Sequence, residues 1–160
     1  PSPPPPHPTQ QVWTEVMGGS KVWRSVAMAA NGVTQTAVAY GGNIWRSANS
    51  GASWTEVTST GGGKSWWSVA MSADGVTQTA VVWDGNIWRS TNSGETWTEV
   101  IVAGGAKDWQ SVAMAANGVT QTAVAYGGNI WRSANSGASW TEVTSTGGGK
   151  NWVSVAMSAD

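Results

Sequence analysis

The sequence contains no cysteine and no phenylalanine, and its single histidine is His7. Without cysteine the chain can form neither disulfides nor thiolate metal sites. His7 stands among prolines, so one chain cannot assemble a histidine metal cluster or a histidine-based catalytic dyad. We therefore expect no metal and no cofactor.

Charge is also scarce. Eight Lys and Arg and nine Asp and Glu make up 11% of the 160 residues, with a net charge of -1, whereas soluble domains usually carry about 25% charged residues. Such a balanced chain has no basic field for a phosphate backbone, so nucleic acid is not an expected partner. It also has no run of 18 apolar residues, so we expect no membrane insertion.

Proline is absent after residue 8, because all six prolines lie in the first eight residues. Such a segment favours an extended polyproline II conformation without a core. We interpret residues 1–11 as a Pro-rich linker. The alternative is a ligand for a proline-recognising domain.

Tryptophan is abundant, with thirteen copies that follow an internal repeat. The motif Trp-Thr-Glu-Val begins at Trp13, Trp54, Trp97 and Trp140, at separations of 41, 43 and 43 residues. The forty residues from Ser25 to Lys64 are identical to Ser111–Lys150. This identity favours recent duplication of a two-unit segment, and a designed repeat protein is the alternative.

Each repeat is predicted to form four short strands and no helix. An Asp-Gly or Asn-Gly pair, a strong hairpin signal, separates the first two strands, as at Asp74-Gly75. In the middle repeat the strands are expected at 66–71, 77–83, 86–90 and 97–100. The period, strand count and turn residues predict an all-β fold of β-propeller blades. The expected divisions are a partial blade at 12–16, blades at about 22–57, 65–100 and 108–143, and a partial blade at 151–160.

Three complete blades are too few for a ring, because propellers close with about four to eight. Three explanations remain open. The chain belongs to a longer protein, which we favour, or copies of it associate to complete a ring, or it forms an open array inside a larger assembly.

Between the third and fourth strands the middle repeat reads Ser90-Thr91-Asn92-Ser93-Gly94-Glu95-Thr96-Trp97. This segment resembles the Asp-box, or bacterial neuraminidase repeat, written Ser-x-Asp-x-Gly-x-Thr-Trp. This chain has asparagine where the family usually has aspartate, which disfavours a cation site. A short Asx side chain is expected to bond backbone amides two residues on, while the glycine adopts positive φ. We expect a structural role for these residues: Ser47, Asn49, Gly51, Trp54, Ser90, Asn92, Gly94, Trp97, Ser133, Asn135, Gly137 and Trp140.

The resemblance implies a propeller similar to sialidase-like, sortilin-like and photosystem assembly factor-like propellers, and it does not settle function. A sialidase-like site would need clustered single-copy arginines, but Arg46, Arg89 and Arg132 share one repeat position. The glutamates after Trp-Thr also repeat, and we expect them to oppose these arginines across a hairpin. No pair of carboxylates stands out as a glycosidase site, so no catalytic residue is predicted.

Residues that vary between repeats offer candidates for binding. Just before Ser-Val-Ala-Met, variable positions flank a regular tryptophan that we assign to packing between blades. The candidates for a contact surface are Arg24, Trp67, Asp108 and Gln110. Trp67 is the most informative, because an extra aromatic beside polar residues suits a protein hot spot or sugar stacking.

These observations predict a non-catalytic propeller module for structural assembly or protein–protein contact, extracellular or on a cell surface. Its partner would be another protein or copies of itself. A glycan-binding lectin is the alternative function, and a sialidase-like hydrolase is disfavoured.

Overall fold

The computed structural model describes residues 15–17 and 19–158, and the predicted all-β fold is confirmed there. The strands of this part of the chain are β1 (Val22–Met28), β2 (Gln35–Gly42), β3 (Ile44–Ser47), β4 (Thr55–Val57), β5 (Lys64–Met71), β6 (Gln78–Val82), β7 (Ile87–Ser90), β8 (Thr98–Val100), β9 (Trp109–Met114), β10 (Gln121–Ala125), β11 (Ile130–Ser133) and β12 (Thr141–Val143). A short 3-10 helix, η1 (Thr144–Thr146), follows β12.

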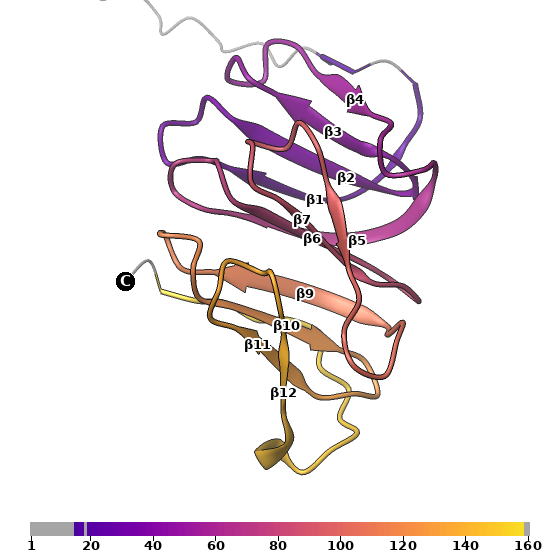
Figure 1. Cartoon of the computed structure of the whole chain (residues 1–160). Helices are drawn as coiled ribbons and strands as arrows, with labels where there is room; N and C mark the ends of the chain where they lie inside the picture. The colour runs from indigo at the N-terminus through magenta and orange to yellow at the C-terminus, as the bar shows by residue number, and fades with distance from the viewer. Residues whose placement is uncertain (1–14, 18, 159–160) are drawn as a thin grey trace, which may run out of the picture.

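The strands form three four-stranded antiparallel units: blade 1 (β1–β4), blade 2 (β5–β8) and blade 3 (β9–β12). Strands that are consecutive in a blade pair with each other. The end of β2 also pairs with the start of β5, through Tyr40 with Ser65 and Gly42 with Lys64, and this pairing joins blades 1 and 2. In Figure 1 the blades lie one above another in chain order, from indigo to yellow.

The turn between the first two strands of a blade is fixed by local hydrogen bonds. After β5, the Asp74 carboxylate accepts from the Ser72 hydroxyl and, at 2.9 Å, from the Val76 amide. These two bonds, the Ser72 bond foremost, hold the pKa of Asp74 below its usual value. Gly75 follows with φ +79°, and a Cβ built there would lie 3.1 Å from the Ala29 Cβ. The turn therefore needs glycine for its backbone angle and for its approach to blade 1.

Two apolar clusters lie between the blades. Between blades 1 and 2, Val38, Ile44 and Val57 pack against Trp66, Val69, Ala80, Trp88 and Trp97. Between blades 2 and 3, Val81, Ile87 and Val102 pack against Trp109, Val112, Ala123, Trp131 and Trp140. We call the first-named side of each interface the trailing face of its blade, and the tryptophan-rich side the leading face of the next blade. Strand β6 is buried at all five residues, because blade 2 is covered on both faces.

Polar bonds also cross each interface. The Thr36 hydroxyl donates to Gln78 Oε1 at 2.7 Å, and Thr79 repeats this bond to Gln121 at 2.7 Å, both inside the protein. At the hairpin tips, the Ala30 amide donates to the Ala73 carbonyl at 2.8 Å. The first strands of neighbouring blades lie side by side, since the Ser25 hydroxyl accepts from the Val69 amide of β5 at 3.3 Å. The repeat therefore builds one interface twice.

The two ends of the described chain do not form the strands expected there. Residues 12–14 lie outside the described residues, and Glu15 and Val16 have no strand. The segment 151–158 has no strand either, because no second strand of the same blade pairs with it among the described residues. It nevertheless occupies the first-strand position beside blade 3, where the Val155 amide donates to the Ser111 hydroxyl at 3.3 Å.

Candidate functional site

Three of the positions that vary between repeats are bulge residues. In blade 1, Trp23 faces Ala39 and Ser25 faces Val38, so Arg24 has no partner residue on β2. Trp67 and Gln110 are left unpaired in the same way in blades 2 and 3. A bulge turns the side chain of its extra residue away from the regular alternation of the strand. The residue type therefore varies between repeats at the strand position that has no partner on the neighbouring strand.

The bulges of blades 1 and 2 bring Arg24 and Trp67 together. The Arg24 guanidinium carbon lies 4.1 Å from the Trp67 ring centroid and 5.3 Å from that of Tyr40. Trp67 meets Tyr40 edge-on at 6.2 Å and lies tilted against Trp83 at 5.1 Å. We call these four residues the bulge cluster. It combines a cation with three aromatic rings, of which Tyr40 is 44% exposed.

Sequence reasoning missed Tyr40 and Trp83. Tyr40 lies near the end of β2 and Trp83 directly follows β6, at the repeat position that Tyr126 occupies in blade 3. A tryptophan in place of tyrosine in the middle repeat was the available signal. This signal does not by itself predict the cluster, because the bulge in β5 is what places Trp67 beside Trp83.

Asp108 and Gln110 do not join the bulge cluster. Neither side chain makes a ring, hydrogen-bond or ion-pair contact with the cluster, although both residues belong to the equivalent segment of blade 3. The side-chain nitrogen of Gln110 is buried and has no hydrogen-bond partner among the described residues. The structure thus brings together two of the four predicted candidates.

An open cleft of 580 Å³ adjoins the cluster and is lined by Tyr40, Lys64, Trp83, Asp84, Glu99 and neighbouring residues. Asp84 has φ +51°, whereas the matching residues of blades 1 and 3 are glycines. Aspartate tolerates this left-handed conformation better than most residues, and here it adds a carboxylate to the cleft wall. Lys64 lies 4.9 Å from the Trp88 ring centroid. Both signs of charge therefore border the aromatic surface.

The repeated glutamates do not oppose the arginines, and this prediction was wrong. Residues of β3 and β4 pair so that Glu56 faces Trp45 and Arg46 faces Thr55. The Glu56 carboxylate instead accepts from the Asn43 side-chain amide at 2.9 Å. The same bond recurs from Asn86 to Glu99 at 3.0 Å and from Asn129 to Glu142 at 2.9 Å.

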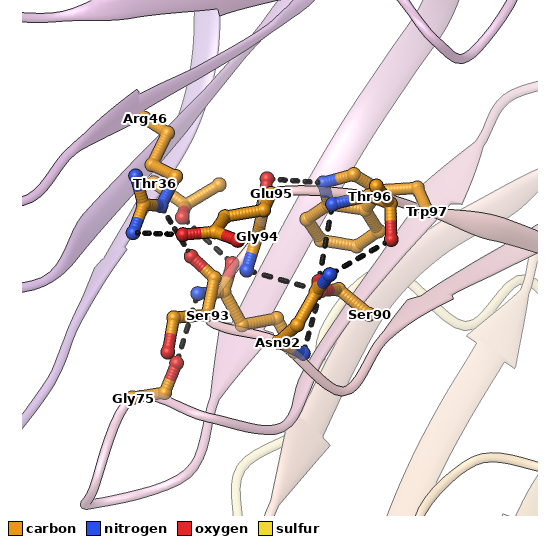
Figure 2. Close-up of polar contacts among 11 residues, drawn as sticks. Thr36, Arg46, Gly75, Ser90, Asn92, Ser93, Gly94, Glu95, Thr96 and Trp97 are labelled. Atoms are coloured by element: carbon orange, nitrogen blue, oxygen red, sulfur yellow. Dashed lines mark hydrogen bonds and ion pairs between the residues drawn. The ribbon is translucent and has the colours of Figure 1, made fainter.

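The third-strand arginines reach the next blade. Arg46 Nε donates to the Ser93 carbonyl at 2.6 Å, and its guanidinium lies 3.4 Å from the Glu95 carboxylate (Figure 2). Arg89 donates likewise to the Ser136 carbonyl. Arg132 of blade 3 is exposed and donates to no described residue. This regular placement gives the arginines a role in packing between blades.

The loop from Ser90 to Trp97 is closed by its own side chains (Figure 2). The Asn92 side-chain oxygen accepts from the Thr96 amide at 3.0 Å, four residues on, whereas the sequence predicts a bond two residues on. The Ser90 hydroxyl accepts from the Gly94 amide at 3.0 Å, and the Trp97 indole donates to the Gly94 carbonyl at 3.1 Å. The wider loop holds Ser93 and Gly94 at positive φ, 58° and 81°. The loops beginning at Ser47 and Ser133 repeat these bonds.

In residues 15–17 and 19–158, no group of three or more His, Cys, Asp or Glu side chains could hold a metal ion. Within the same residues, no helix has the length and apolar character to cross a membrane.

No protein-family model and no curated protein matches the chain. Among solved structures it is similar to YCF48 bound to D1 peptide, with a TM-score of 0.63 and 15% identity over 76% of this chain and 40% of that one. It is similar to the computationally designed protein Ika4 (TM-score 0.65, 11% identity, 89% and 86% of the two chains). It is also similar to the GH74 enzyme of Niastella koreensis (TM-score 0.59, 25% identity, 76% and 18%).

These likenesses confirm the blade architecture of a β-propeller. The chain spans less than half of the YCF48 chain and about a fifth of the GH74 enzyme.

Proposed function

We propose that this chain supplies Asp-box blades to a non-catalytic β-propeller that binds a protein segment at the bulge cluster. The observation that carries the proposal is the contact of Arg24 with Trp67, 4.1 Å from guanidinium carbon to ring centroid. The two residues stand at one repeat position, and both differ from Gln110 at that position in blade 3.

The chemistry of the cluster suits a peptide that carries a carboxylate. Arginine stacked on an aromatic ring keeps its N–H edge available for a bidentate bond to a carboxylate. Among the described residues Arg24 has no acidic partner within ion-pair distance. Tyrosine, tryptophan and arginine are also the residues most enriched at protein hot spots. The expected ligand is an extended segment with an acidic residue next to an apolar one.

The likeness to YCF48 bound to D1 peptide supports a peptide-binding role at the level of the fold. The likeness to a GH74 enzyme keeps catalysis as the competing class. Glu56, Glu99 and Glu142 favour the non-catalytic assignment, because each already accepts from an asparagine. The Asp-box assignment is supported by the hydrogen bonds of the Ser90–Trp97 loop. An extracellular location forms part of the same proposal.

Selection from a random peptide display library tests this function. The change is Trp67→Gln, because glutamine already stands at the matching bulge, Gln110. Selected peptides should be rich in Asp or Glu, and Trp67→Gln should weaken their binding by at least about tenfold, the effect of losing a hot-spot aromatic. Tyr126→Ala is the control, because Tyr126 is 47% exposed at the position of Trp83 but lies outside the cluster.

Failure to select any peptide, or equal binding by the wild type and Trp67→Gln, would contradict the proposal. Binding on a glycan array that disappears in Trp67→Gln would replace it with the lectin alternative.

A further inference from the structure

The cleft beside the bulge cluster draws several lining residues from positions where blade 2 differs from both other blades. Its lining lies between residues 40 and 106, in the middle of the described chain. Blades 1 and 3 have Ala, Tyr, Gly and Gly at the four positions concerned, and blade 2 has Val82, Trp83, Asp84 and Ala106. Residues that distinguish blade 2 thus gather around one cavity.

Asp84 stands in a backbone conformation that glycine adopts more easily. Its φ is +51°, and Gly41 and Gly127 hold the matching turns of blades 1 and 3 at +67° and +66°. A side chain in the left-handed region costs free energy that glycine avoids. Asp84 is exposed, and its carboxylate makes no hydrogen bond or ion pair with a described residue. The folded chain itself makes no use of this carboxylate, and residues held in such conformations cluster at binding sites.

The other charges of the cleft are already engaged. The Glu99 carboxylate accepts from the Asn86 side-chain amide at 3.0 Å. The Lys64 ammonium lies 4.9 Å from the centroid of the Trp88 ring, a contact that recurs in blade 3. Lys64 therefore belongs to the packing that the repeats share. Asp84 is the charged residue of the cleft that is left for a ligand.

The surroundings of Asp84 suit a cationic side chain. Trp83 precedes it in the chain, and Tyr40 of blade 1 lies in the wall of the same cleft. Lysine or arginine beside such rings gains from cation–π attraction. The Asn86 side-chain oxygen in this wall is buried and accepts no hydrogen bond from the described residues. The cleft thus offers aromatic rings, a free carboxylate and an unused oxygen acceptor to one ammonium or guanidinium group.

We infer that this cleft takes the side chain of a lysine or arginine of the bound peptide, with Asp84 as the residue that selects it. The inference rests on the proposed peptide binding and specifies the ligand: an acidic residue at Arg24 and a basic residue at Asp84. Trp67 and Trp83 lie between the two charges, with their ring centroids 5.1 Å apart. An extended peptide covers about 3.3 Å per residue, so its two charged residues stand about two to four positions apart. The opposite charges of Arg24 and Asp84 fix the direction in which the peptide lies.

Selection from one random peptide display library on the wild type and on Asp84→Gly tests the inference. Glycine occupies this turn in the other blades, so Asp84→Gly should unfold at or above the wild-type temperature. Peptides selected on the wild type should carry Lys or Arg at a fixed spacing from their Asp or Glu. Peptides selected on Asp84→Gly should keep the acidic residue and lose the preference for the basic one.

A synthetic peptide from the wild-type selection then measures the contact. Replacing its basic residue by alanine should weaken binding to the wild type by about three- to tenfold, the size of an ion pair with a cation–π contact. The same replacement should leave binding to Asp84→Gly unchanged. Asp108→Ser is the control, because Ser65 stands at the matching position of blade 2 and Asp108 lies outside the cleft. In this variant the basic residue of the peptide should keep its full effect.

Acidic peptides without a preferred basic residue would overturn the inference and leave the proposed peptide binding in place. So would a basic residue whose replacement weakens binding to Asp84→Gly as much as binding to the wild type. Failure to select any peptide on the wild type would overturn the proposed function and this inference together.

Discussion

In the loop between β7 and β8, side-chain oxygens accept hydrogen bonds from backbone amides that have no partner strand. The Ser90 hydroxyl accepts from the Gly94 amide, and the Asn92 oxygen accepts from the Thr96 amide. Ser90 is only 1% exposed, so water cannot easily replace its oxygen. Asparagine retains the acceptor that aspartate would offer and gives up the charge. The loop is thereby shaped by hydrogen bonds from its own side chains.

We expect Ser90→Ala to lower the free energy of unfolding by about 1–3 kcal/mol, because it leaves the buried Gly94 amide without a partner. Chemical denaturation measured by tryptophan fluorescence checks this. Ser59→Ala is the control, since Ser59 is exposed and its hydroxyl makes no hydrogen bond with the described residues. It should change stability by less than about 0.5 kcal/mol. Equal effects of the two changes would show that the loop does not depend on the Ser90 oxygen.

At the scale of elements, the blades are held together by one set of bonds used twice. Thr36 with Gln78 and Thr79 with Gln121 connect second strands through the core. The arginines of the third strands connect each blade to the following loop. The threonine–glutamine bonds and the arginine–carbonyl bonds both recur at the repeat period. In each of these contacts, a polar group of one blade is therefore satisfied by the neighbouring blade.

Thr79→Val should therefore destabilise the protein by about 1–3 kcal/mol, because it removes the donor and leaves the buried Gln121 oxygen without a bond. Thr122→Val is a matched control at the same position of blade 3, where the hydroxyl has no described partner. This change should cost less than about 0.5 kcal/mol. A loss of similar size in both variants would contradict a role for the cross-blade bond.

The strands and turns could be predicted because their signals are local. The Asp74-Gly75 pair and the alternation after Trp66 depend on neighbouring residues, and β5 and β6 lie where these signals placed them. The partner of Arg46 could not be predicted this way, since Ser93 lies 47 residues away in another blade. The expected contact between Glu56 and Arg46 does not form, because the register of β3 and β4 places Glu56 opposite Trp45. The bulge at Trp67 was likewise invisible, because the sequence reads as an ordinary strand there.

At the scale of the whole molecule, the division between constant and variable residues follows the packing. Residues that repeat unchanged, such as Trp66 and Trp109, fill the interfaces between blades. Arg24 and Trp67 vary, lie on bulges and meet outside the ladder. The fold can therefore change its contact surface without disturbing its core, and we place ligand binding on that surface.

The most direct test follows the indole N–H resonances of the thirteen tryptophans by NMR while a selected acidic peptide is added. The account predicts that the signals of Trp67 and Trp83 shift in a saturable way, while those of the buried Trp66, Trp109 and Trp131 stay in place. Saturable shifts confined to other tryptophans, with Trp67 and Trp83 unchanged, would contradict the assignment of the bulge cluster as the binding surface.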